Sequence, residues 1–224
     1  MRLVIRIGGS VVASPLNPTL MNHYAELLQD LKRQNHEVAV VVGGGSLSRE
    51  LIRTAKAMGL SDPYQDEVAI SVSRVMAQLL ALRLGKSGSL TVPTTIEDAA
   101  KLFEKGKIVV MGGLKPGMTT DTVAALLAER LNADLLVKAT DQEGIYNRDP
   151  RRFPEAHKLD SIRFSDLPKL FEANKHRAGI HQIVDPEAVR ILHKRRIKTV
   201  IVNGFKPENI LLVVKGEKIG TAIE

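Results

Sequence analysis

Three glycine-rich turns, each placed after an apolar run, are the parts of this sequence best suited to chemistry. They are IGGS at residues 7–10, VVGGGSLSR at 41–49 and MGGLKPGMTTD at 111–121. Adjacent glycines let backbone N–H groups approach an anion closely, and a helix that starts after the turn adds its positive end. One such turn alone is usually just a tight turn, whereas three at equivalent strand ends would converge on one crevice. The set predicts a ligand with several phosphates.

Charged side chains beside these turns could stabilise a phosphoryl group during its transfer. Arg6, Arg49 and Lys138 supply positive charge, and Asp121 supplies a carboxylate that could orient the cations or hold Mg²⁺. Each has a plainer interpretation. Arg6 could be a strand residue whose head reaches solvent, and Asp121 could be an ordinary acid in the first turn of a helix.

Two familiar phosphate motifs are absent from these turns. Residues 112–119 have the glycine spacing of the Walker A loop, but Met118 stands where that loop has lysine. Residues 43–48 lack the third glycine of the dinucleotide-binding GxGxxG pattern. The turns are therefore neither a P-loop nor a Rossmann fingerprint.

The elements that must position these turns alternate between strand and helix. Short aliphatic runs predict strands at residues 2–7, 37–42, 107–111, 134–138 and 198–202. Capping residues and amphipathic spacing predict helices at 18–35, 46–58, 65–84, 95–106, 120–131 and 186–196. The tail alternates again, as strands do, at 211–214 and 219–223. The pattern predicts an α/β fold, a three-layer α/β/α sandwich around a mainly parallel sheet.

Composition limits the class of protein. The chain has 224 residues, 44% of them hydrophobic and 25% charged, and it contains no cysteine. The absence of cysteine excludes disulfides, thiolate metal sites and a thiol nucleophile. The apolar runs are shorter than the ~18 residues that suggest a membrane span, and the N-terminus does not resemble a signal peptide. We expect a cytoplasmic protein of one domain without a membrane segment.

A net charge of +7 raises the alternative of a nucleic-acid partner. The densest basic cluster, HKRRIK at residues 193–198, lies at the end of a predicted helix. Cations there complement the helix dipole and face water. Because no recognised nucleic-acid motif accompanies the cluster, nucleic-acid binding is the weaker hypothesis.

The order of motifs in this chain resembles the amino acid kinase superfamily and, within it, the UMP (uridylate) kinases of the archaeal type. The matching segments are IGGS, VVGGGSLSR, GGLKPGMTTDTVAALLAE, VKATDQEGIYNRDP and IVDPEAVRIL, in register along the chain. The TTD and KAT segments are specific, whereas the glycine pairs are not. Isopentenyl phosphate kinases carry a histidine just after the GGG turn, where this chain has Ser46, Leu47, Ser48 and Arg49.

The resemblance implies transfer of a phosphoryl group from ATP to UMP, which gives UDP and ADP for UTP and CTP synthesis. It also implies Mg²⁺ as a cofactor and a homohexamer. It assigns catalysis to Asp121, Arg6, Lys138 and Arg49, and no residue as a metal ligand. The ATP contacts it implies are Gly9, Ser10, Gly45, Arg49, Thr140, Tyr146 and Asp149. The UMP contacts it implies are Gly44, Asp66, Leu114, Lys115, Pro116, Gly117, Met118, Thr119 and Thr120.

This chain departs from the family pattern at two places. Arg6 stands where the superfamily often has lysine, so the main catalytic cation is open between Arg6 and Lys138. The frequent VDG of the nucleotide loop is replaced by Gln142, Glu143 and Gly144. For Tyr146 and Asp149, spacing alone indicates a loop packed over the turn before Pro150.

Within the single domain we expect an acceptor lobe at about residues 1–135 and an ATP lobe at about 136–224. The polar stretch at 141–160 is the one candidate boundary. The alternatives are a kinase for another small phosphate or carboxylate, of the isopentenyl phosphate or acetylglutamate type, and a non-catalytic nucleotide- or oxyanion-binding member of the fold.

Overall fold

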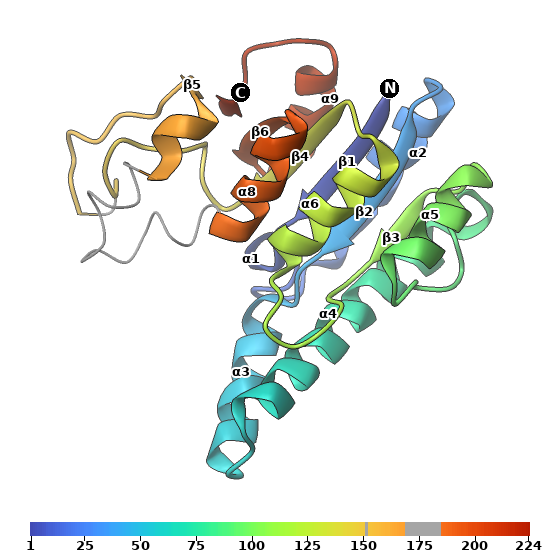
Figure 1. Ribbon diagram of the computed structural model, residues 1–224. Coiled ribbons are helices and arrows are strands. Elements are labelled where there is room, and N and C mark those ends of the chain that lie inside the picture. Colours follow the sequence, from blue (N-terminus) through green and yellow to red (C-terminus); the bar gives the residue numbers. More distant parts are fainter. Residues whose placement is uncertain (151, 169–184) are drawn as a thin grey trace.

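The computed structural model describes residues 1–150, 152–168 and 185–224. This part of the chain contains a seven-stranded sheet of order β3-β2-β1-β4-β6-β7-β5 (Figure 1). All neighbouring strands run parallel except β6 and β7. The strands are β1 (Arg2–Ile7), β2 (Glu37–Val42), β3 (Val109–Met111), β4 (Leu135–Thr140), β5 (Ser161–Ile162), β6 (Lys198–Asn203) and β7 (Thr221–Ile223). The predicted mainly parallel sheet is confirmed.

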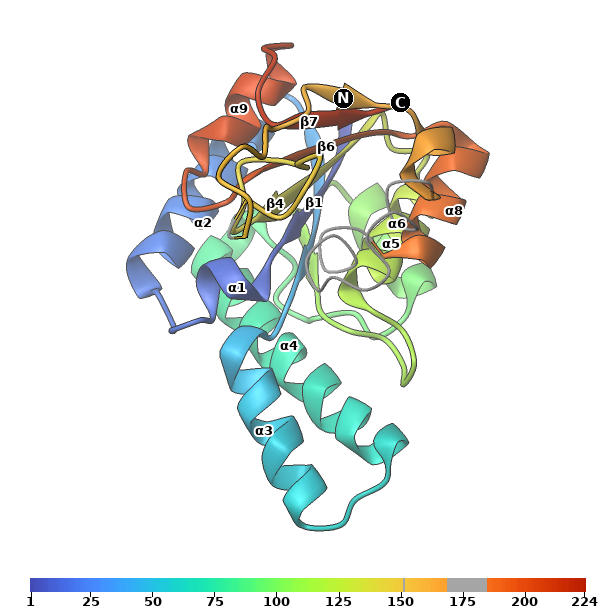
Figure 2. The same cartoon turned by 90° about the vertical axis from the view of Figure 1, so that its left-hand side faces the viewer.

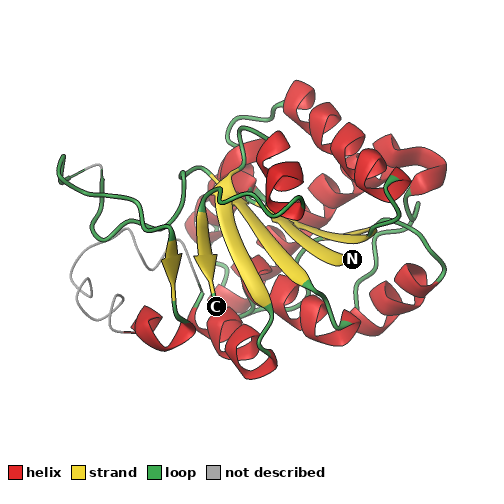
Figure 3. Ribbon diagram, turned by 90° about the horizontal axis from the view of Figure 1, so that it is seen from above, coloured by secondary structure: helices red, strands yellow, loops and turns green. Residues whose placement is uncertain are grey.

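Helices cover both faces of the sheet and make it the middle of three layers (Figure 3). One face packs against α2, α4 and α9, and the other against α5, α6 and α8. The helices are α1 (Gly9–Val12), α2 (Pro18–Arg33), α3 (Gly45–Ala57), α4 (Asp62–Leu84), α5 (Ile96–Glu104), α6 (Thr120–Leu131), α8 (Pro186–Arg195) and α9 (Glu208–Val214).

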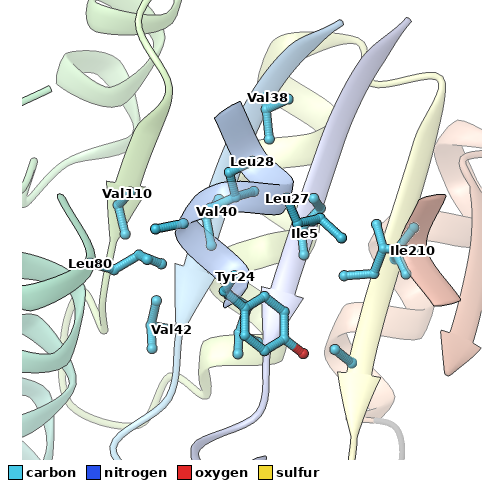
Figure 4. Packing of buried hydrophobic residues seen from close by; sticks show 14 of the residues in the cluster. Ile5, Tyr24, Leu27, Leu28, Val38, Val40, Val42, Leu80, Val110 and Ile210 are labelled. Carbon is cyan, nitrogen blue, oxygen red and sulfur yellow. The ribbon is translucent and has the colours of Figure 1, made fainter. Parts of the chain in front are cut away.

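Alternation along the central strands divides the core between the two faces. On β1, Ile5 belongs to the cluster that also contains Tyr24 and Leu28 of α2 and Leu80 of α4, where Leu80 lies beside Val110 of β3 (Figure 4). Val4 points to the opposite face, where the helices α5, α6 and α8 lie. Because successive strand side chains alternate, Arg6 points to that same second face. The pattern thus directs one charged residue of β1 toward α6.

The helix boundaries follow the capping residues of the sequence. Asn17 accepts a hydrogen bond from the Leu20 N–H at 2.9 Å and starts α2, with Pro18 in the first turn. Thr95 accepts from the Asp98 N–H at 3.1 Å and starts α5. These two predicted starts are confirmed, because a cap depends on residues only two or three positions away.

One predicted helix start and one predicted strand are wrong. Helix α4 begins at Asp62 instead of residue 65, with Ser61 as its N-cap residue and Pro63 in its first turn. Residues 211–214 belong to α9 and not to a strand. There Asn209 donates a hydrogen bond to the Asn203 carbonyl at 3.2 Å, and this bond ties the start of α9 to the end of β6.

Helices α3 and α4 form an arm that extends beyond the carboxyl ends of the strands (Figure 2). By length and composition alone, α4 with the turn after it is apolar enough to cross a membrane, and 44% of its most apolar stretch is buried inside the protein. A core helix of a soluble protein has the same properties. The expected absence of a membrane segment therefore stays a prediction.

Candidate active site

The three glycine-rich turns lie at the carboxyl ends of the adjacent strands β1, β2 and β3. The first two pack backbone against backbone, since a β-carbon at Gly43 would lie 2.8 Å from the Gly9 nitrogen. The third packs on α4, where a β-carbon at Gly112 would lie 2.7 Å from the Arg74 nitrogen. Only glycine allows these approaches. The predicted position of the three turns at equivalent ends of the strands is confirmed.

An ion-pair cluster of Arg6, Asp121 and Lys138 lies beside these turns. Arg6 and Lys138 are register partners on β1 and β4, and both point toward the start of α6. There the Asp121 carboxylate is 2.8 Å from Arg6 Nε and 2.5 Å from Lys138 Nζ. Arg6 Nη2 also donates to the Thr120 hydroxyl at 3.0 Å. The structure thus places one carboxylate between two predicted catalytic cations.

Burial makes this cluster electrostatically strong. The three side chains are 16%, 14% and 6% exposed for Arg6, Asp121 and Lys138. Burial alone would raise the pKa of Asp121, but the charges of Arg6 and Lys138 outweigh it and hold the pKa below its ordinary value. Burial lowers the pKa of Lys138, against the opposing attraction of Asp121. Asp121 therefore stays ionised at neutral pH.

The depressed pKa of Asp121 predicts a loss of stability in acid. Because the folded pKa lies below the unfolded value of about 3.9, its ion pairs contribute stability above that value and lose it as the pH falls through the folded pKa. We expect the free energy of unfolding to fall as the pH drops from about 5 through the lowered folded pKa, and to fall less in Asp121→Asn. Urea unfolding at a series of pH values measures this free energy.

The matched control for this experiment is Asp98→Asn. Hydrogen bonds from Thr95 and Lys101 also lower the pKa of Asp98, but its side chain is exposed to solvent, which screens the effect. Its pH profile should stay close to that of the wild type. Parallel profiles for the wild type and Asp121→Asn would contradict the electrostatic role of the cluster.

The outer edge of the Arg6 guanidinium faces the glycine turns. A β-carbon at Gly8 would lie 3.1 Å from Arg6 Nη1, and one at Gly43 would lie 3.5 Å from Arg6 Nη2. Lys138 is more enclosed, and its ammonium rests on Asp121. Arg49 is not part of this cluster: it lies on α3 and donates to the Ser14 hydroxyl at 3.3 Å. Of the two cations in the cluster, Arg6 is thus the one that lies against the first and second turns.

A small cavity of about 170 Å³ lies between α4 and the third turn. Six of the predicted acceptor-side residues line it, namely Gly44, Asp66, Lys115, Met118, Thr119 and Thr120. Three others, Leu114, Pro116 and Gly117, lie outside the lining of this cavity. The Gly117 N–H instead donates to the Asp66 carboxylate at 2.7 Å and ties the loop to α4.

Two residues of α4 that the sequence did not single out also hold the third turn. Ser73 Oγ accepts from the Gly113 N–H at 2.8 Å. Arg74 donates from Nε to the Gly113 carbonyl at 3.0 Å and from Nη2 to the Leu114 carbonyl at 2.9 Å. A forked pair of bonds from arginine fixes both position and orientation. In the sequence, Ser73 and Arg74 show only as members of a helix.

The residues predicted for the ATP side come from several places. Gly9 and Ser10 start α1, Gly45 starts α3, and Thr140 ends β4, where its carbonyl accepts from the Gly204 N–H at 2.7 Å. Tyr146 and Asp149 lie in the loop after β4, which is tied to β7 by the Ile145 N–H and the Thr221 hydroxyl at 2.9 Å. Their contact with a nucleotide stays a prediction.

The expected Mg²⁺ would bind to oxygen atoms such as those of Asp and Glu side chains. Within the described residues, no group of three or more His, Cys, Asp or Glu side chains could hold a metal ion. Both Asp121 oxygens already face cations. The expected use of Mg²⁺ stays a prediction.

The basic cluster at residues 193–198 lies apart from the turns, at the far end of α8. His193, Lys194 and Arg195 form the last turn of that helix. Arg195 pairs with Glu129 at 2.6 Å, and the His193 ring stacks on Phe164. Lys194 and Arg195 complement the helix dipole, as predicted, but Arg195 pairs with an acid and does not simply face water.

The fold is a mostly parallel α/β sandwich, with glycine turns and a buried ion-pair cluster at the strand ends. This arrangement is the one predicted for an α/β protein that binds phosphate groups. The family model for the amino acid kinase family matches residues 1–203, and the chain belongs to that family. It is 40% identical to the uridylate kinase of Methanocaldococcus jannaschii over 226 residues, which cover 100% of both chains. It is also 40% identical to the uridylate kinase of Methanococcoides burtonii, over 99% of this chain and 94% of that protein.

A solved structure has the same fold over the whole length of the chain. The crystal structure of uridylate kinase from Archaeoglobus fulgidus matches with a TM-score of 0.91 at 35% identity, over 100% of both chains. The predicted resemblance is thus confirmed at full length.

Proposed function

We propose that this protein is a UMP kinase that transfers the γ-phosphoryl group of ATP to UMP, giving UDP and ADP for pyrimidine nucleotide synthesis. The observation that carries the reaction type is the buried Arg6–Asp121–Lys138 cluster beside the paired glycine turns. The choice of acceptor is supported by full-length relatives named uridylate kinase.

In this proposal the side chains position and neutralise charge, which is most of what phosphoryl transfer requires. Asp121 orients Arg6 and Lys138, and these cations with Arg49 stabilise the group in transfer. An oxygen of the acceptor phosphate is already anionic at neutral pH, so no general base is needed. Bound Mg²⁺ would neutralise charge on the ATP phosphates, which would themselves supply oxygen ligands to the ion.

Substrate contacts are divided between two sides of the crevice. The acceptor side, from about residues 1–135, carries Gly44, Asp66 and the loop 114–120. The ATP side, formed largely by residues 136–224, carries Thr140, Tyr146 and Asp149, completed by Gly9, Ser10, Gly45 and Arg49. Catalysis in the cytoplasm is part of the proposal.

A panel assay tests the proposed acceptor. Steady-state rates with ATP should be far higher for UMP than for CMP, isopentenyl phosphate or acetylglutamate. A preference for another acceptor would replace UMP within the same class of kinase. Binding of nucleotides with no transfer to any acceptor would identify a non-catalytic member of the family.

Asp66→Ala is expected to raise the KM for UMP and to leave the KM for ATP nearly unchanged. One Asp66 oxygen accepts from the Gly117 N–H, and the carboxylate lines the proposed acceptor cavity, where it could bind ribose hydroxyls. Loss of a charge-assisted hydrogen bond costs about 1.5 to 3 kcal/mol, or roughly 10-fold or more in KM. Initial-rate kinetics for both substrates measure it.

The control is Asp62→Ala, which removes an exposed acid one turn earlier on α4. It should behave as the wild type does toward both substrates. Equal rises in the two KM values of Asp66→Ala would instead point to a purely structural role for Asp66.

The α3–α4 arm supports the proposed homohexamer. Val75, Leu79 and Leu82 lie on one face of α4 and are 53%, 51% and 55% exposed. A groove of about 480 Å³ continues this face and is lined mainly by Leu47, Leu51, Val68, Val72 and Val75. Exposed apolar surface of this extent marks an interaction site, and a second copy of the same arm offers matching apolar surface.

Val75→Glu combined with Leu79→Glu is expected to dissociate the assembly into smaller species. A carboxylate buried in an apolar contact is strongly unfavourable. Light scattering after size-exclusion chromatography measures the mass, with Glu104→Lys, a charge change at an exposed acid of α5 outside the arm, as a control that should keep the wild-type mass. An unchanged mass of the double variant would place the contact between subunits elsewhere.

A further inference from the structure

The starts of two helices meet beside the proposed acceptor cavity, and one carboxylate joins them. Asp185 is the N-cap of α8, and its Oδ1 accepts from the Glu187 N–H at 2.8 Å. Its Oδ2 accepts from the Thr122 hydroxyl at 2.7 Å and also from the Thr119 hydroxyl. One oxygen of Asp185 therefore bonds the start of α8, and the other bonds the start of α6.

Thr119 is itself the N-cap of α6. Its hydroxyl oxygen accepts from the Thr122 N–H at 3.1 Å, while its hydroxyl hydrogen goes to Asp185. A hydroxyl has only one hydrogen, so these bonds fix the rotamer of Thr119. The next residues along the chain are Thr120, which bonds Arg6, and Asp121, which pairs with Arg6 and Lys138. The carboxylate of Asp185 thus acts on the residue where the proposed acceptor loop becomes α6.

A capping role alone does not explain this arrangement. The cap of α8 needs only Oδ1, and it would leave Oδ2 to solvent. Here Oδ2 is used by two hydroxyls of another helix, and one of them belongs to Thr122, which is only 5% exposed. Thr119 lines the acceptor cavity, whereas Thr122 does not. The bonds therefore connect α8 to a wall of that cavity.

We propose that Asp185 is a positioning residue for the acceptor: through Thr119 and Thr122 it holds the end of the acceptor loop in the geometry that binds the acceptor phosphate. The inference rests on the proposed function. Asp185 contacts no reacting atom in this role. It acts on the loop, so its loss should change the KM for the acceptor more than the KM for ATP.

Asp185→Asn separates the two duties of this side chain. The amide oxygen can still cap α8, and asparagine is a good N-cap residue. The amide nitrogen that replaces Oδ2 is a donor and accepts no hydroxyl hydrogen. We expect the KM for UMP to rise roughly 10-fold, with the KM for ATP within about twofold of the wild-type value.

Thr122→Val provides an independent variant of nearly the same shape. It removes one hydroxyl from Asp185 and keeps the Thr122 N–H that bonds Thr119. The KM for UMP should rise about threefold, and the double variant should be no worse than Asp185→Asn alone, because both changes break the same connection. Glu187→Gln is the matched control, since it removes an exposed charge from the first turn of α8 without contact to α6. It should leave both KM values unchanged.

Three results would overturn the inference. Equal rises in both KM values would show a general structural defect, and additive effects in the double variant would show that the two residues act separately. A lower KM for UMP in Asp185→Asn would show that the carboxylate competes with the acceptor phosphate. If the wild type phosphorylates a different acceptor of the panel, the proposed function fails, and the same comparison with that acceptor tests Asp185.

Discussion

Asp121→Asn is expected to lower kcat by roughly 100-fold or more, the scale of losing one preorganised electrostatic group. The substitution keeps the shape of the side chain and removes the charge between Arg6 and Lys138. Two buried cations then repel each other, and neither is held in the direction of the glycine turns. Because the effect falls on groups that act in the transition state, kcat should change more than either KM.

Steady-state kinetics on a verified folded variant measure this effect. The matched control is Asp98→Asn, an acid in the first turn of α5 that has no such cluster around it. It should keep wild-type kcat. A folded Asp121→Asn protein with nearly normal kcat would remove Asp121 from the proposed mechanism.

Arg6→Ala is expected to cause the larger loss of kcat of the two cation variants. The guanidinium of Arg6 pairs with Asp121 on one side and lies next to Gly8 and Gly43 on the other, where the phosphates are proposed to bind. The ammonium of Lys138 is nearly enclosed and contacts Asp121 at 2.5 Å. We expect roughly a 100-fold loss or more for Arg6→Ala and a smaller loss for Lys138→Ala.

Single-turnover rates separate the two roles, because they isolate the chemical step from substrate binding. Arg6→Lys should remain active if positive charge at this place is what matters, although it loses the forked donors of arginine. The reverse order of the two alanine variants would make Lys138 the main catalytic cation. Wild-type chemistry in both would exclude both residues from the transfer step.

The sheet was predictable because its signals are local. A run such as Glu37–Val42 is apolar on both faces, and its bounds match the predicted strand. The helix α6 likewise spans the predicted residues, since Thr119 caps it and Asn132, in a left-handed conformation, ends it. The segment at 211–214 failed because four residues cannot distinguish a short alternation from one helical turn.

The candidate site was predictable only in part, for the same reason. Strand-end logic brought Arg6, Lys138 and Asp121 together, since parallel neighbours end at one edge of a sheet. Arg74 bonds a loop 39 residues further along the chain, and Asp185 bonds a hydroxyl 63 residues before it. Such contacts depend on how helices pack over the sheet, and no spacing within the sequence records that. The sequence predicted a helix that begins at residue 186, but it did not predict that Asp185 bonds the hydroxyls of Thr119 and Thr122.

The position of β1 in the sheet has a consequence for synthesis of the chain. This N-terminal strand lies between β2 and β4, and its residue Leu3 is paired with Leu135. A ribosome that adds ~5 to 20 residues per second needs roughly 7 to 26 s to pass from one to the other. During this time the edge of β1 that pairs with β4 lacks its partner strand, and four of the six residues of β1 are apolar. Newly made chains therefore expose unpaired backbone N–H and C=O groups on β1 until the C-terminal half of the chain has been synthesised. Slow translation would favour association of these chains through that edge.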